Sequence, residues 1–281
     1  MMRPLRPARP VVLAGLVVLA GLVVLAAPAL PGAPRAATLE ATYRVTLAGL
    51  PVGTATLRTE IGARRRYALR LDATLSGLAS VLWGGKGTAT AQGGLAEAAV
   101  RPQSFALDAD YGGTPISERM SLDAGRLVAV HMTPDARAKP DRVPARPGDD
   151  RDVVDPLSAL IGPQLSPPGA PTARDCDRTL PVHDGTARFD VPLGEGQAMT
   201  FDGPGYAGPA VLCRARYVPL SGHRPKRWVV RAMQENRDLR VWLAPVGSSR
   251  VLAPVRIAVG TTFGTAMAEV TAWRLDEPGG R

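Results

Sequence analysis

Apolar and polar residues alternate along most of the chain in short segments. In residues 41–47 (ATYRVTL), Tyr43, Val45 and Leu47 fall on one face and polar residues fall on the other. Successive side chains of a strand point to opposite faces, so this period of two predicts a half-buried β-strand. The turn AGLP at 48–51 separates it from a second alternating segment, which predicts an opening hairpin.

The same alternation predicts strands through the rest of the chain. They are expected at 52–61, 66–75, 87–91, 103–110, 117–122, 126–132, 186–191, 210–218, 227–235, 240–243, 251–259 and 262–275. Short connections without helical patterns favour antiparallel pairing, with one face in water and one on a core. The predicted fold class is all-β: an antiparallel, strongly curved sheet or open β-barrel with one short helix.

Residues 155–162 (DPLSALIG) carry the signals of that short helix. Aspartate stands at the cap, proline at the first helical position and glycine at the end. Leu157, Leu160 and Ile161 form an apolar stripe, which we expect to pack on the concave face of the sheet. The sequence allows two roles for this segment: a lid over a ligand site, or a part of a filled core.

The domain organisation follows from two departures from this pattern. Residues 134–152 contain five basic residues, five acidic residues and four prolines, which predicts an exposed, mobile loop. We expect residues 38–281 to form a single β-rich domain that includes this loop. Two smaller halves, separated by residues 134–172, are the alternative.

The N-terminus has the pattern of an export signal. Residues 1–10 contain three arginines and no acidic residue, and residues 11–27 contain no polar side chain. This pattern predicts a signal peptide at 1–37 and a periplasmic location, with an uncleaved inner-membrane anchor as the alternative. We expect the remaining chain to be soluble, and a peripheral association with the membrane stays open.

Composition and charge exclude some classes of protein. Hydrophobic residues make up 45% of the chain and charged residues 21%, which indicates a globular protein with a core. The net charge is +9, but four arginines lie in the predicted signal peptide, which leaves 30 basic and 25 acidic residues, or +5. Because this remainder is spread along the chain, no nucleic-acid partner is expected.

The residues that carry chemistry are few. Cys176 and Cys213 are the two cysteines, and in an oxidising compartment we expect a disulfide, with two unlinked buried thiols as the alternative. The three histidines are isolated, and the motifs H-E-x-x-H, G-x-S-x-G and C-x-x-C do not occur. The sequence therefore predicts no catalytic residue, no metal and no cofactor.

Several motifs together resemble a known family. The opening hairpin YRVTLAGLPVGTA, the segment DPLSALI, Cys-Asp-Arg at 176–178 and His-Asp-Gly at 183–185 resemble the bacterial exported family of domain of unknown function 3108 (DUF3108). The resemblance spans about Leu39 to Trp273, and His183 departs from it, since that position is more often apolar. The resemblance implies an exported, β-rich envelope protein without an established activity or catalytic residues.

Three functions are consistent with these observations. The first is a non-enzymatic module whose curved sheet binds an apolar ligand, such as an acyl chain, or a lipidated partner protein. The second is a structural or interaction protein of the cell envelope, which recruits a partner strand at the edge of its sheet. The third is a hydrolase with an unrecognised site.

Overall fold

The computed structural model describes residues 37–62, 65–76, 85–96, 99–135, 137, 139–162 and 169–277. The predicted signal peptide at 1–37 lies outside the described residues except for Ala37. Among the described residues, no helix is both long and apolar enough to span a bilayer.

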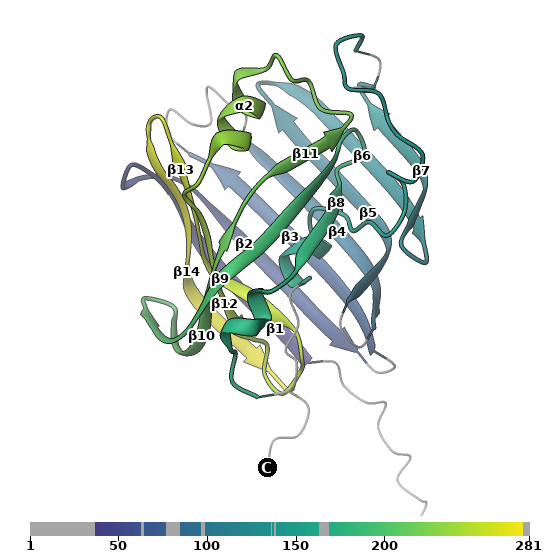
Figure 1. The fold of residues 1–281 in the computed structure, drawn as a ribbon. Helices are drawn as coiled ribbons and strands as arrows, with labels where there is room; N and C mark the ends of the chain where they lie inside the picture. The colour runs from purple at the N-terminus through teal and green to yellow at the C-terminus, as the bar shows by residue number, and fades with distance from the viewer. Residues whose placement is uncertain are drawn as a thin grey trace, which may run out of the picture. The chain divides into compact units, whose positions relative to one another are not determined.

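One antiparallel sheet of 14 strands organises the protein (Figure 1). From one edge to the other, its strands are β11 (Val218–Ser221), β9 (Arg188–Gly203), β10 (Tyr206–Ala215), β12 (Leu239–Pro245), β13 (Leu252–Thr261), β14 (Gly264–Asp276), β1 (Ala37–Leu47), β2 (Leu50–Gly62), β3 (Arg66–Leu75), β4 (Lys86–Leu95), β5 (Val100–Tyr111), β6 (Thr114–Asp123) and β7 (Arg126–Thr133). In addition, β8 (Thr179–His183) pairs with β9. The sheet does not close into a barrel, so the predicted fold class is confirmed.

The two halves of the chain are joined at the centre of this sheet. The first strand, β1, pairs with the last, β14, over ten residue pairs from Thr38↔Asp276 to Leu47↔Ala266. Elsewhere most neighbouring strands are also neighbours in sequence. Strands from before and after residues 134–172 therefore belong to one continuous sheet.

The sheet curves around a short segment of its own chain. A single 3-10 turn, η2 (Ser158–Ile161), contacts both β5 and β13, although six positions separate these strands in the sheet. Both parts of the sheet can reach η2 only if the sheet is strongly bent. In Figure 1, β9 and β11 accordingly pass in front of the β3–β5 region. We call the face that contacts η2 the inner face.

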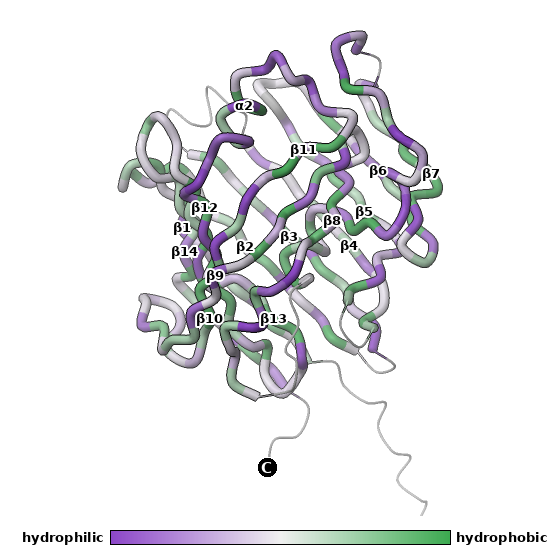
Figure 2. Tube along the Cα trace, viewed as in Figure 1, coloured by the Kyte–Doolittle hydropathy of each residue, from purple (hydrophilic) through white to green (hydrophobic). Residues whose placement is uncertain are grey.

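The core lies on this inner face. Leu39, Leu57, Met120, Phe201 and Val255 are almost fully buried there. The alternation that defines each strand places polar residues on the opposite face, and the two kinds of residue intermix along the strands in Figure 2. Burial of one face explains why the alternation located most strands.

The helix expected at 155–162 is much shorter than predicted. The structure has one 3-10 turn there, and the Asp155 Oδ1 accepts the backbone N–H groups of Leu157 and Ser158 at 3.0 and 2.8 Å. The preceding residue, Val154, is bridged to Val182 of β8. The segment is thus held by a side-chain cap and a strand contact, which leaves little length for a helix.

The strand predicted at 227–235 is wrong. The structure has an α-helix, α2 (Trp228–Glu235), in that region. Val229, Ala232 and Met233 are spaced by three and four residues, which is the spacing of one helix face. The mixture of Trp, Val and Arg in this segment resembles the alternation of apolar and polar residues in a strand.

The two cysteines form the expected disulfide. Cys176 and Cys213 are joined with a Cα–Cα distance of 5.5 Å, and neither is exposed. Cys176 ends a second 3-10 turn, η3 (Ala173–Cys176), so the bond fastens η3 to β10. Together with Leu243 and Leu252 the two cysteines belong to a small second core.

The charged segment at 134–152 makes several contacts with the rest of the protein. Arg224 binds Asp141 at 2.8 Å, and the backbone of Val143 exchanges hydrogen bonds with His223 and Gly222 at 2.9 and 2.8 Å. These contacts place the segment beside the chain that follows β11. Its mobility stays a prediction.

Candidate functional site

Two pockets lie on the inner face, one on each side of η2. The larger has a volume of about 600 Å³ and is lined by residues of β3 to β7. The smaller has a volume of about 220 Å³ and is lined by residues of β8, β9, β10, β12 and β13. Pro156 and Leu160 line both pockets. The two pockets therefore share one wall, which is the η2 segment.

The larger pocket is built on one row of inward-facing residues. Strand pairing places Leu71, Ala89, Leu107, Glu118 and Met132 side by side across β3 to β7. All five line the pocket, and four of them are apolar. The row thus forms an apolar floor that contains one carboxyl group.

Alternation explains how a carboxyl group reaches the inner face. Glu118 shares its face of β6 with Met120 and Leu122, both buried. The next residue, Arg119, points to the opposite face, where it forms a bidentate ion pair with Asp108 at 2.8 Å. The basic residue beside Glu118 is therefore engaged on the other side of the sheet.

Glu118 lacks a partner in the pocket. The residue is 9% exposed, and its Oε1 atom is buried with no hydrogen-bond partner among the described residues. Burial, and to a smaller extent the negative charges of Asp184 and Asp155, together raise the pKa of Glu118 to about 7. This carboxyl group is therefore far more readily protonated than an exposed glutamate.

Asp155 is a second buried carboxyl group close to the pocket. Its side chain is buried, and its Oδ2 atom has no hydrogen-bond partner in the part of the chain that the structure describes. Burial raises the pKa of Asp155 to about 6, while hydrogen bonds from Ser158 and Leu157 act in the opposite direction. Ser158 in turn shares a hydrogen bond of 2.7 Å with the hydroxyl of Tyr67. This network fastens η2 to β3.

The turn at 183–187 completes the polar part of the larger pocket. Asp184 and Thr186 line the pocket, and the Asp184 Oδ1 accepts hydrogen bonds from the backbone of Thr186 and Ala187 at 2.9 and 2.6 Å. These bonds fix the Asp184 carboxylate on the same side of the pocket as Glu118.

A glycine lets this turn approach Glu118 closely. Gly185 has a φ of +77°, and a Cβ atom there would lie 2.3 Å from the Glu118 Oε1. The backbone N–H of Gly185 donates a hydrogen bond to the Nδ1 of His183 at 3.0 Å. Burial lowers the pKa of His183, so this imidazole adds little positive charge near the carboxyl groups.

The smaller pocket has a different character. Its lining includes Val182, Phe189, Val191, Val241 and Ile257, and no charged side chain belongs to the lining among the described residues. These residues come from β8, β9, β12 and β13. The smaller pocket can therefore accept only apolar groups.

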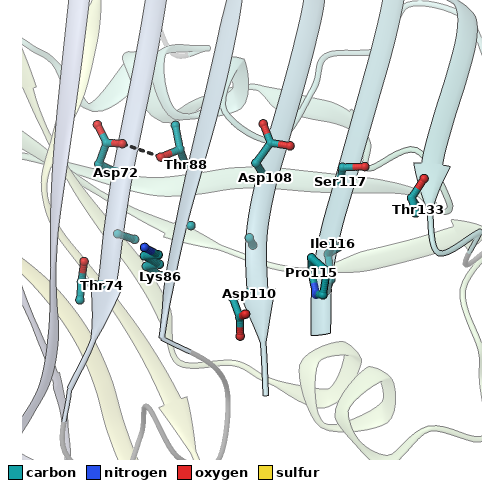
Figure 3. Close-up of a pocket in the computed structure, with 13 residues that line it drawn as sticks. Asp72, Thr74, Lys86, Thr88, Asp108, Asp110, Pro115, Ile116, Ser117 and Thr133 are labelled. Atoms are coloured by element: carbon teal, nitrogen blue, oxygen red, sulfur yellow. Dashed lines mark hydrogen bonds between the residues drawn. The ribbon is translucent and has the colours of Figure 1, made fainter. Parts of the chain in front are cut away.

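A third hollow lies on the opposite face of the sheet (Figure 3). Asp72, Thr88, Asp108, Ser117 and Thr133 form a row across β3 to β7 there. Its acidic side chains have partners: Asp72 binds Arg70 and Thr88, and Asp108 binds Arg119. These ion pairs are about half exposed. We interpret this hollow as solvated surface.

The structure brings the predicted site residues together only in part. Leu157 and Leu160 line the larger pocket, whereas Ile161 is fully buried in the core. The disulfide of Cys176 and Cys213 belongs to the second core, away from this lining. The role of the segment as a lid stays a prediction.

Glu118 is the main residue that the sequence analysis missed. A signal was present, because Glu118, Met120 and Leu122 occupy alternate positions of the strand predicted at 117–122. One acidic residue on an otherwise apolar face indicates a buried carboxyl group, and such groups concentrate at functional sites. Within the described part of the chain, no three His, Cys, Asp or Glu residues gather as metal ligands.

These observations define a curved antiparallel β protein with an inner pocket that contains a buried carboxyl group. The chain belongs to the family described as "Protein of unknown function (DUF3108)", whose model matches residues 42–271. The comparison with curated proteins gave no match.

The chain is similar in fold to solved structures. One of them is the crystal structure of a beta-barrel-like protein of domain of unknown function DUF1849 from Brucella abortus. The two sequences are 11% identical, the match covers 87% of this chain and 100% of that chain, and the TM-score is 0.42. The comparisons indicate no enzymatic family.

Proposed function

We propose that this protein binds an amphiphilic ligand in the two inner pockets. The apolar chain of the ligand lies along η2, and its polar head lies at Glu118. The observation that supports this most strongly is the pair of pockets that share Pro156 and Leu160, of which only the larger contains acidic groups.

The dimensions and lining suit such a ligand. Binding sites for small molecules have volumes of roughly 300–1,000 Å³, are mostly apolar and contain a few polar groups that orient the ligand. The larger pocket has about 600 Å³ and contains Glu118 and Asp184 on an apolar floor. An acyl or alkyl chain fits this combination better than a fully polar molecule.

The charges restrict the head group. Glu118 and Asp184 line the larger pocket, and none of the described residues of its lining is basic. A ligand carboxylate or phosphate would meet these acidic groups without a counter-charge. The proposal is therefore a neutral or cationic amphiphile, such as one with an amine or hydroxyl head, and not a free fatty acid.

The proposed setting is the periplasm. The basic and apolar N-terminal residues predict export, and a disulfide between Cys176 and Cys213 is typical of proteins in oxidising compartments. A periplasmic protein with this pocket would carry or shield an envelope amphiphile, without catalysis. A lipidated partner protein would be held through the same apolar pocket.

A partner strand at the sheet edge is less well supported. The edge strand β7 has bonds to its own chain, since Leu127 donates to the Asp150 carbonyl at 2.8 Å and Arg137 donates to the Val130 carbonyl at 3.3 Å. These contacts occupy backbone groups that an added strand would need. The inner pockets therefore carry the proposal.

A pocket-filling substitution tests the proposal. In Ala89→Leu, the added side chain enters the larger pocket, and binding of dodecylamine measured by titration calorimetry should weaken at least about tenfold. Thr90→Leu is the matched control, because it adds a similar side chain to the opposite face of the same strand. If both variants bind dodecylamine as the unchanged protein does, the pocket is not the site.

A further inference from the structure

We propose that one end of the sheet docks onto an anionic membrane surface. The surface consists of α2, the tip of the β1–β2 hairpin and the tip of the β13–β14 hairpin. This inference does not depend on the proposed ligand.

Strand pairing places these three segments at one end of the sheet. The end of β1 pairs with the start of β14 through Leu47↔Ala266, so the two hairpin tips adjoin. Ala48 also donates a backbone hydrogen bond to Thr265 at 2.9 Å. The start of β12, directly after α2, pairs with β13 through Leu239↔Val259. Figure 1 shows α2 and the yellow β13–β14 tip at the same upper end of the view.

Large apolar side chains are exposed at this end. Leu50 and Phe263, at the two hairpin tips, are 69% and 68% exposed. Trp228 and Val229, in the first turn of α2, are 61% and 44% exposed. Half of the eight large hydrophobic residues exposed in the described chain are thus at one end. Such a concentration marks an interaction surface.

The helix itself lacks a buried face. None of the residues of α2 is buried, and Val230, Ala232 and Met233 are only half-buried. An isolated helix of this length is unstable in water. Asn236 anchors its end by donating from Nδ2 to the Gly260 carbonyl at 2.8 Å. The exposed Trp228 side therefore has room for a partner.

Exposed basic residues lie close to Trp228 in sequence. Lys226, Arg227, Arg231 and Arg237 are all exposed, and none of them forms a salt bridge among the described residues. Glu235 is the one acidic residue of α2. The positive charge is therefore available to an external anion.

This combination favours an anionic bilayer as the occupant. Tryptophan partitions into the interfacial layer of a bilayer, and basic residues near an anionic leaflet add favourable electrostatic energy. In such a bilayer the apolar side chains of the hairpin tips would enter the acyl-chain region, and the basic residues would contact the negatively charged head groups. Lys226, Arg227 and Arg231 flank the apolar residues Trp228 and Val229 within six positions.

Vesicle binding tests the inference. The test uses the purified full-chain protein, with vesicles of phosphatidylglycerol and phosphatidylcholine or of phosphatidylcholine alone. Sedimentation should show binding to the anionic vesicles that falls with salt. The double variant K226E/R227E should weaken this binding at least about tenfold. R66E/R151E is the matched control, because it also reverses the charge of two exposed arginines, and both lie at the other end of the sheet, outside the proposed surface.

The apolar contribution is measured separately. Brominated acyl chains should quench the fluorescence of Trp228, identified as the signal that disappears in W228F. Phe263→Ser should reduce vesicle binding, whereas Val128→Ser, an equally exposed apolar position on β7, should not. Absence of Trp228 quenching overturns the inference. Equal binding to both kinds of vesicle, or a protein partner that binds this surface while vesicles do not, also overturns it.

Discussion

The two inner pockets lie on opposite sides of one segment and differ in size and in charge. Both are lined by alternating residues of antiparallel strands, and both include Pro156 and Leu160. The pocket on β3 to β7 contains Glu118 and Asp184, whereas the pocket on β8 to β13 contains no charged residue in its described lining. The same architecture thus provides an apolar compartment and a compartment with an acidic end, which is the division expected for an amphiphile.

The largest effect should come from the shared wall. Ile161 is fully buried, so Ile161→Asp would place an unpaired carboxylate in the core and cost more than about 4 kcal/mol of unfolding free energy. Leu160 is half-buried and borders both pockets. Leu160→Asp should therefore retain the folded sheet and lose dodecylamine binding.

Circular dichroism melting beside calorimetry separates these outcomes. If Leu160→Asp still unfolds in a cooperative β transition but does not bind dodecylamine, Leu160 contacts the ligand and is not required for the core. Loss of that transition in Leu160→Asp would show that the segment completes a filled core, and the lid role would then be wrong.

The next effect concerns the half that carries the smaller pocket. The Cys176–Cys213 bond closes a separation of 37 residues, and its removal by a double serine substitution should cost about 3–4 kcal/mol on the chain-entropy model. Thermal or denaturant unfolding measures this loss. Neither cysteine lines either pocket, so dodecylamine affinity, measured roughly 20 °C below the new melting midpoint where the variant stays folded, should stay within about twofold. A larger loss of affinity would mean that the two halves are not independent.

A smaller effect is expected in the pH dependence of stability, because Glu118 is a buried acid in the larger pocket. The folded-state pKa of Glu118 is about 7, above its ordinary 4.5, so the folded protein prefers the protonated form. Stability should fall as pH rises through that window and then level off. Glu118→Gln removes this fall and should be about 2–3 kcal/mol more stable than the unchanged protein at pH 8, relative to their difference at pH 4.

Denaturant titrations at several pH values measure that difference. Asp155 has a pKa of about 6, raised by burial, and contributes a similar fall to both proteins. The comparison between the two proteins therefore isolates Glu118. A difference that does not change with pH would show that Glu118 is not buried as an acid.

Much of the fold follows from the local pattern of the sequence. Alternation located most strands because one face of each packs on the core, as at Tyr43 and Leu57. It failed at 227–235, because α2 lies at the end of the sheet and no buried face imposes a period of two. The pairing of β1 with β14 joins residues more than 200 positions apart, which no local pattern specifies.

The site was harder to predict for the same reason. The DPLSALI segment was recognised as unusual, and Leu157 and Leu160 do line the larger pocket. The acidic end of the larger pocket is formed by Glu118 of β6 and by Asp184, which lies in a turn far along the chain. Sequence spacing therefore does not indicate that these two residues meet. Glu118 alone was detectable, as an acidic residue on the apolar face of a strand.

The central claim is that Glu118 and Asp184 select the head group of the ligand, and one measurement tests it directly. Titration calorimetry at pH 8 compares dodecylamine with dodecanoate, which have the same chain length and opposite charges. The account predicts that dodecylamine binds at least about tenfold more tightly, and that Glu118→Gln removes most of this preference. Equal affinities, or tighter binding of dodecanoate, would contradict it.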